Sequence, residues 1–194
     1  MRLADDPDVK LMLDFQGGDE DAFVMLYQRY RDRLINFSRR MLGSAAQGEE
    51  AAQEVFLKLY RVRDRYTPKS KLSTFLWRMA FNHCLNIRAR KEHQLVDVNL
   101  PVERQAAEGE AMEERLERHE RLEALQRNIA ALPEKQAAAL LLCHFDGLSY
   151  RDAAEALGVS ESAIKSLIHR AREGLTRAMN PYLTGPSEVK HALR

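Results

Sequence analysis

The sequence predicts an all-α protein of two small helical domains joined by a linker, the second of which contains a helix-turn-helix. Apolar residues recur at three- and four-residue spacing through most of the chain, and serine or aspartate precedes several of these runs, as at helix amino termini. Residues 93–111 lack this periodicity and hold a proline and a glycine, so they predict the linker. No strand pattern occurs before Lys91.

Residues 19–92 are expected to form the first domain, preceded by an aspartate-rich segment over residues 1–18 whose apolar residues predict a docked helix. Asp19 is expected to cap a long helix that ends at Gly43. A second helix, over residues 47–61, should pair with it in antiparallel orientation.

A basic loop and a third helix complete this domain. Proline, lysines and serine predict an exposed loop over residues 67–73, with Ser73 capping the helix that follows. Aromatic, amide and basic residues alternate there, which suits binding to unpaired bases because stacking contributes ~1–3 kcal/mol per base. The alternative is that Phe75 and Trp77 are core residues and the basic residues only solubilise the helix. The residues expected at the surface or its edge are Trp77, Arg78, Asn82, Asn86, Arg88 and Arg90.

Residues 112–180 are expected to form the second domain, with four helices, and residues 181–194 a tail. The first helix carries an apolar stripe that includes Leu122 and ends before Pro133. The second ends near Gly147. The remaining two form the helix-turn-helix.

In this motif, Ser149 and Ser160 each precede an amphipathic run, and Gly158 lies between the two runs where a left-handed residue turns the chain. One face of the second helix has the spacing of a buried stripe. The opposite face can donate hydrogen bonds to phosphates and base edges, as a recognition helix does in the major groove, although a solvated basic face is the alternative. The predicted DNA contacts on this face are Ser162, Lys165, Ser166, His169, Arg170 and Arg172.

The charge distribution favours a nucleic-acid partner although the net charge is only +1. Residues 58–92 hold ten Lys and Arg against two acidic residues, whereas residues 97–123 hold nine acidic residues against four arginines.

Cys84 and Cys143 each adjoin a histidine, but without further ligands they are expected to be core residues. The chain is expected to be cytoplasmic, without membrane insertion, because it has no signal-peptide pattern and no run of ~20 apolar residues.

The order of these segments resembles the extracytoplasmic-function group of bacterial sigma factors. The motifs that carry the resemblance are AAQEVFLKLYR and KLSTFLWRMAFNHCLNIRARK in the first domain and LPEKQAAALLLCHFDGLSYRDAAEALGVSESAIKSLIHRARE in the second. The match covers about residues 19–179. It implies a protein that binds core RNA polymerase and promoter DNA, is controlled by an anti-sigma factor, and uses no cofactor and no small-molecule substrate.

The resemblance also implies roles for individual residues. Lys165, Ser166, His169 and Arg170 match the readers of the upstream promoter element, with Arg172 suited to the DNA backbone. Residues 66–73 and Asn82 match a pocket for a base flipped from the downstream element. The predicted downstream contacts are Tyr66, Lys69, Lys71, Ser73, Trp77, Asn82, Asn86 and Arg88, and the predicted polymerase contacts are Glu50, Gln53 and Glu54.

Two other function classes compete with a sigma factor. A two-component or quorum-type regulator also ends in a four-helix domain with such a motif, but its first half should alternate strands and helices. An enzyme is disfavoured because the sequence has no Walker-type GxxxxGK[ST], no nucleophile elbow and no metal-ligand cluster.

Overall fold

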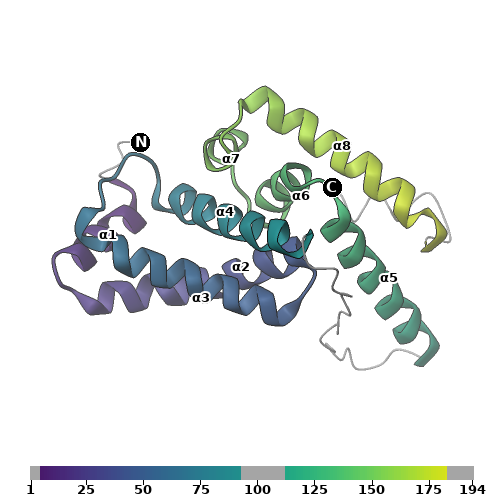
Figure 1. Ribbon diagram of the computed structural model, residues 1–194, viewed down its shortest axis with the longest axis horizontal. Helices are drawn as coiled ribbons and strands as arrows, with labels where there is room; N and C mark the ends of the chain where they lie inside the picture. The colour runs from purple at the N-terminus through teal and green to yellow at the C-terminus, as the bar shows by residue number, and fades with distance from the viewer. Residues whose placement is uncertain (1–4, 93–111, 183–194) are drawn as a thin grey trace.

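Every regular element is helical in residues 5–92 and 112–182, the part of the chain that the computed structural model describes (Figure 1). The predicted all-α class is therefore confirmed. The predicted linker and most of the predicted tail lie outside the described residues. The elements are α1 (Pro7–Gln16), α2 (Glu20–Leu42), α3 (Ala45–Val62), η2 (Arg63–Arg65), α4 (Leu72–Glu92), α5 (Met112–Ala131), α6 (Glu134–Leu140), η3 (Leu141–Phe145), α7 (Tyr150–Leu157), α8 (Glu161–Met179) and η4 (Asn180–Tyr182).

Side-chain caps begin the first three helices. Asp6, Asp19 and Ser44 each accept hydrogen bonds from backbone N–H groups in the first turn of α1, α2 and α3. Gly43 ends α2 with a left-handed φ of 70°, so the predicted bounds of this helix are confirmed. In contrast, α4 begins one residue before Ser73, so the prediction that Ser73 caps it is wrong.

Aromatic rings join α1, α2 and α3. The ring of Phe15 lies 4.9 Å from that of Phe23 and 5.3 Å from that of Tyr60, measured between centroids. Such pairs add ~0.5–1.5 kcal/mol to the free energy gained by burying the rings. With Val9 and Met12 also buried, α1 is the docked helix predicted within residues 1–18.

The second half of the described chain packs α8 against α5, α6 and α7. Helix α6 continues into η3, a π-turn in which the N–H of Asp146 donates to the carbonyl of Leu141 at 3.1 Å. Gly147, with a φ of 67°, then redirects the chain toward α7. On α5, Ile129 is buried but Leu122 is exposed, so the prediction that Leu122 belongs to the apolar stripe is wrong.

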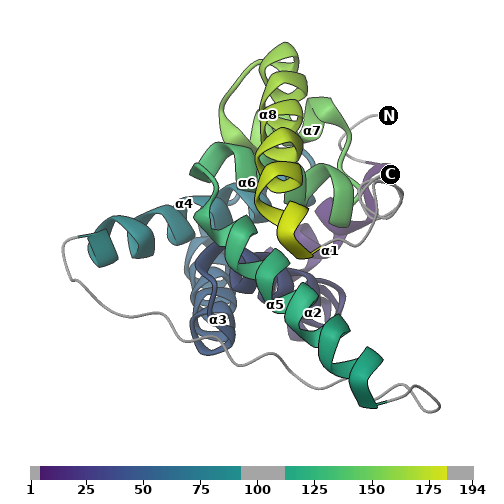
Figure 2. The same ribbon diagram turned by 90° about the vertical axis from the view of Figure 1, so that its right-hand side faces the viewer.

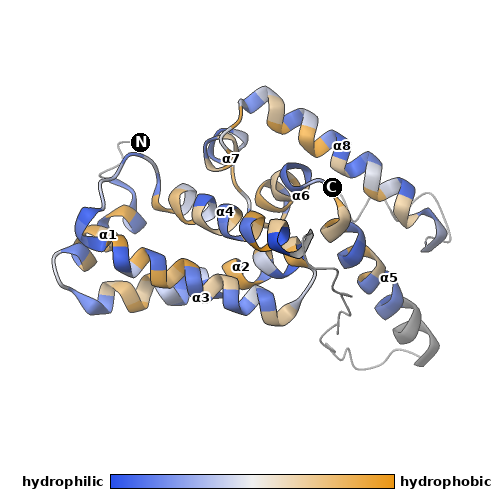
Figure 3. Cartoon of the chain, viewed as in Figure 1, coloured by the Kyte–Doolittle hydropathy of each residue, from blue (hydrophilic) through white to orange (hydrophobic). Residues whose placement is uncertain are grey.

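The two halves contact each other directly. Helix α4 packs on α7, and α2 packs on α5 and α6. In Figures 1 and 2, α6 and α7 lie between α8 and the helices of the first half, which leaves one side of α8 facing outward. Hydrophilic residues recur along the whole of α8 (Figure 3). Among the described residues, no helix has the length and apolar character required to cross a bilayer.

Candidate nucleic-acid interface

The predicted helix-turn-helix forms as α7, a turn at Gly158, and α8. The Oγ of Ser149 accepts from the N–H of Asp152 at 3.1 Å, and the Oγ of Ser160 accepts from the N–H of Ala163 at 3.2 Å. These bonds satisfy donors that the first turn of each helix leaves unpaired. Gly158 has a φ of 63°, a conformation in which a side chain would be strained, so the turn predicted there is confirmed.

Helix α8 separates its residues by face. Ile164, Ile168, Ala171 and Leu175 are buried and attach it to the rest of the fold. The residues predicted to contact the upstream element are all exposed, and they are Ser162, Lys165, Ser166, His169, Arg170 and Arg172.

Few internal contacts restrain this outward face. The Oγ of Ser166 donates to the carbonyl of Ser162 at 3.4 Å, and the ring of His169 lies 3.7 Å from the carboxylate of Glu173. Both side chains of the second pair are more than half exposed, and exposed contacts of this kind contribute ~0–1 kcal/mol even between charged groups. An incoming DNA phosphate could displace them at little cost.

A second candidate surface combines the loop over residues 66–71 with one side of α4. The eight predicted downstream contacts divide by burial. Lys69, Asn82 and Asn86 are exposed, Lys71, Ser73 and Arg88 are half-buried, and Tyr66 and Trp77 are buried. The structure therefore presents only part of the predicted set at the surface.

Trp77 is 0% exposed, so the expectation that its ring stands at the surface is wrong. Its centroid lies 5.3 Å from that of Phe37, and the guanidinium of Arg33 covers the ring at 5.4 Å. The core alternative is correct for this residue. Because α4 contacts α1, α2, α3 and α7, it is buried on more than one face.

Tyr66 is also unavailable for stacking on a base. Its ring is buried 5.8 Å from that of Phe75, and its hydroxyl makes no hydrogen bond with the described residues. Burial raises the pKa of this hydroxyl to about 12. Tyr66 thus supports the loop from inside, and in this conformation its ring is not presented at the surface.

Two of the predicted downstream contacts are held by the second half of the chain. The Nζ of Lys71 lies 2.8 Å from the carboxylate of Asp152. The guanidinium of Arg88 donates to the carbonyl of Leu132 at 3.2 Å and lies 3.6 Å from the carboxylate of Glu134. Their cationic groups are therefore already partnered when the two halves are in contact.

Sequence reasoning missed other residues that join the halves. Arg33 donates to the carbonyl of Asp146 at 2.8 Å, and Arg78 donates to the carbonyl of Glu155 at 2.7 Å. Each arginine is more than 70 residues from its partner in the sequence, so no local pattern could have identified either pair.

The predicted polymerase contacts lie along α3. Glu50 and Gln53 are exposed, and Glu54 is half-buried. One helical turn after Gln53 on α3, Leu57 has 47% of its surface exposed. Val55 and Phe56 face the core, and the next residue of a helix points in another direction. The sequence therefore contained a signal that Leu57 is an apolar residue outside the buried stripe.

Among the described residues, neither cysteine belongs to a group of side chains that could bind a metal ion. Cys84 is buried and Cys143 half-buried, and burial raises the pKa of each thiol to about 11. Within residues 5–92 and 112–182, no group of three or more His, Cys, Asp or Glu residues could hold a metal ion.

Each half of the chain matches a model of a known protein family. Residues 26–94 match the family model described as Sigma-70 region 2, and residues 122–175 match the one described as Sigma-70, region 4. The RNA polymerase sigma-H factor of Pseudomonas aeruginosa is 31% identical over 189 residues, covering 93% of this chain and 98% of that protein. The ECF RNA polymerase sigma factor SigW of Bacillus subtilis is 30% identical over 170 residues, covering 84% of this chain and 91% of that protein.

A solved structure shares the fold. The sigma factor RpoE from Bartonella quintana, in a co-crystal with the anti-sigma factor NepR, aligns with a TM-score of 0.65 at 21% identity, covering 81% of this chain and 96% of that one. The chain is thus similar to sigma factors over nearly their whole length.

Proposed function

The chain belongs to the sigma-70 family, in the extracytoplasmic-function group of RNA polymerase sigma factors, and from this premise we propose that it recruits core polymerase to promoters by reading two DNA elements. The observation that carries the proposal is the outward face of α8, where six exposed polar and basic residues back onto a buried apolar stripe. In this proposal residues 19–92 serve the downstream element and polymerase, and residues 112–180 serve the upstream element.

The outward face of α8 reads the upstream element as duplex DNA. Lys165, His169 and Arg170 are placed to reach base edges in the major groove, and Arg172 to reach a phosphate. The hydroxyls of Ser162 and Ser166 donate to either. Good bidentate contacts with a base are worth ~1–3 kcal/mol of discrimination.

The loop over residues 66–71 and the exposed amides of α4 capture a base from the downstream element. Asn82 and Asn86 are exposed on successive turns of α4, where their amides can bond to a base edge that pairing would hide. Unstacking a base costs a few kcal/mol, which contacts in the pocket offset, so strand opening draws its free energy from binding.

Core polymerase turns two weak DNA contacts into one strong contact. A chain with a net charge of +1 releases few counterions, so it should bind DNA weakly by itself. Polymerase docks on Glu50, Gln53 and Glu54, with the exposed side chain of Leu57 beside them, and holds the two DNA-binding surfaces at the promoter spacing.

An anti-sigma factor is the proposed regulatory partner. The solved relative with an anti-sigma factor bound has the same fold. An anti-sigma factor would act by covering the DNA- or polymerase-binding surfaces until a signal releases it.

The experiment measures promoter DNA binding over a range of salt concentrations, for the isolated chain and for the chain with core polymerase, together with run-off transcription. We expect tight, specific binding and run-off product only with core polymerase. Equal affinity with and without core polymerase would contradict the proposal. A regulator that only binds duplex DNA would give no initiation with core polymerase alone, so the same experiment separates the two functions.

A further inference from the structure

The last residue of α1 bonds to the backbone that leads into the loop over residues 66–71. The Nε2 of Gln16 donates to the carbonyl of Arg63 at 2.8 Å and to the carbonyl of Tyr66 at 3.1 Å. Arg63 is the first residue of η2 and Tyr66 follows its last residue. A bond from the N–H of Tyr66 to the carbonyl of Arg63 closes this turn at 3.1 Å. One side-chain amide therefore holds both ends of the turn from which the loop departs.

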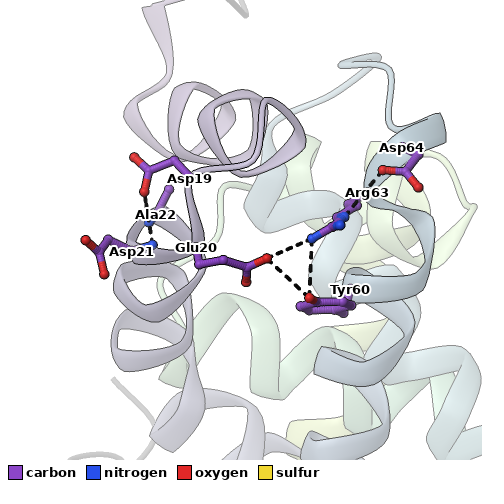
Figure 4. A network of polar contacts seen from close by, with 7 residues as sticks. All are labelled: Asp19, Glu20, Asp21, Ala22, Tyr60, Arg63 and Asp64. Atoms are coloured by element: carbon purple, nitrogen blue, oxygen red, sulfur yellow. Dashed lines mark hydrogen bonds and ion pairs between the residues drawn. The ribbon is translucent and has the colours of Figure 1, made fainter.

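The same turn is also held through a side chain (Figure 4). The Nη1 of Arg63 donates to Glu20 Oε1 at 2.9 Å, and the hydroxyl of Tyr60 donates to the same oxygen at 3.2 Å. The guanidinium lies 4.9 Å from the ring centroid of Tyr60 and 5.3 Å from that of Phe15. Arg63 is thus held at two points: its carbonyl accepts from Gln16 of α1, and its guanidinium donates to Glu20 of α2.

A short turn fixes α1 relative to α2. Gly18 adopts a φ of 104°, and the N–H of Asp19 donates to the carbonyl of Asp14 at 3.0 Å. Met12 and Phe15 are fully buried, so α1 cannot shift without exposing apolar surface. Gln16 consequently acts from a rigid support.

We propose that Gln16 is a positioning residue for the loop over residues 66–71, so that α1 contributes to capture of a downstream base without touching DNA. The inference rests on the proposed function of that loop. A binding pocket discriminates only when its groups are held within about 0.5 Å of the productive geometry. Without the amide of Gln16, the carbonyls of Arg63 and Tyr66 lose their shared donor, and the carbonyl of Tyr66, from which the loop departs, loses this hydrogen bond to α1.

The test uses Gln16→Met, which keeps the length of the side chain and removes both hydrogen bonds. Holoenzymes with the parent chain or the variant are titrated with single-stranded oligonucleotides of the downstream element, each carrying one abasic position in turn. For the parent, removing the captured base should weaken binding by about tenfold or more. For Gln16→Met, the same abasic substitution should weaken binding by only about twofold, because a misplaced pocket no longer distinguishes the base.

Three further variants make the result specific. Gln16→Glu places oxygens against the same carbonyls and should reduce discrimination like Gln16→Met. With two variants at this position, the test still gives an answer if one of them folds poorly. Lys10→Met makes the same replacement at an exposed position of α1 and should retain the parent's tenfold effect. Glu20→Gln keeps the Oε1 acceptor for Arg63 and should also retain it.

The outcomes separate the two proposals. An undiminished abasic effect in both Gln16 variants would overturn the positioning role while leaving base capture intact. If no abasic position weakens binding of the parent, base capture itself is wrong and the role of Gln16 in it fails as well. Unchanged affinity of every variant for core polymerase would show that a loss of discrimination is local to the loop.

Discussion

The carboxyl group of Asp146 shows how a single residue at the contact between the halves responds to burial. Burial raises its pKa to about 6, although two arginines, Arg33 and Arg40, act to lower it. Arg33 lies 3.4 Å from this carboxylate, and its charge only partly offsets the loss of hydration. Asp146 is thus a pH-dependent element of the contact between α2 and the turn after η3.

The pH dependence of folding stability should reveal Asp146. Its folded pKa exceeds its unfolded value, so the folded state binds the extra proton and stability from this group is lost as pH rises from about 4 through 6. The loss is at most about 3 kcal/mol. Asp146→Asn should remove this part of the pH dependence, which urea unfolding at several pH values would measure. Asp32→Asn, at a mostly exposed carboxylate, is the control, and parallel pH curves for Asp146→Asn and the parent would contradict the assignment.

The two thiols should differ in reactivity although burial raises the pKa of both to about 11. Cys143 is half-buried, so Ellman's reagent should modify it slowly at pH 8, whereas the fully buried Cys84 should react only after unfolding. Mass spectrometry of the modified protein identifies the site. Rapid modification of Cys84 in the folded chain would indicate that α4 opens locally.

At the scale of elements, sequence reasoning succeeded where the determinants are local. Asp19 and Gly43 bound α2 because a cap and a left-handed glycine act within one turn of the helix. The outward face of α8 was predictable because the helix is buried along one stripe only. For α4, the assumption that a helix buries only one stripe of residues was wrong at Trp77. Several helices cover α4, and the spacing of residues within α4 does not reveal its neighbours.

Gly48 is an element-scale determinant that the periodicity of α3 did not reveal. An added Cβ would lie 2.8 Å from the backbone nitrogen of Arg39 on α2, which is closer than atoms pack. Gly48→Ala should therefore force α2 and α3 apart and lower the free energy of unfolding by about 1–3 kcal/mol, despite the better helix propensity of alanine.

Gly174→Ala is the matched control. At Gly174 on α8, the added atom would meet only the flexible end of Leu132, at 3.3 Å. Stability should be unchanged or increased by up to about 1 kcal/mol. Chemical unfolding measures both variants, and equal effects at the two glycines would contradict close packing of α2 on α3.

At the scale of the whole molecule, the contact between the halves competes with the proposed function. Lys71 and Arg88, proposed to contact DNA, are bonded to the second half of the chain. Polymerase that holds the two DNA-binding surfaces apart must break these bonds, so part of its binding free energy is spent on separation. These contacts join residues distant in sequence. The sequence therefore predicted two domains but not the contacts between them.

Weakening the contact between the halves should therefore strengthen polymerase binding when DNA is absent. Arg78→Ala removes a 2.7 Å bond to the carbonyl of Glu155 and leaves Lys71 and Arg88 in place. One such bond contributes ~0.5–1.5 kcal/mol, so the affinity for core polymerase, measured without DNA, should rise about two- to tenfold. Arg31→Ala, whose partner is the adjacent Asp32, should leave it unchanged. Since DNA is absent, lost phosphate contacts cannot mask the effect, and unchanged or weaker binding of Arg78→Ala would mean that polymerase accepts the halves in contact.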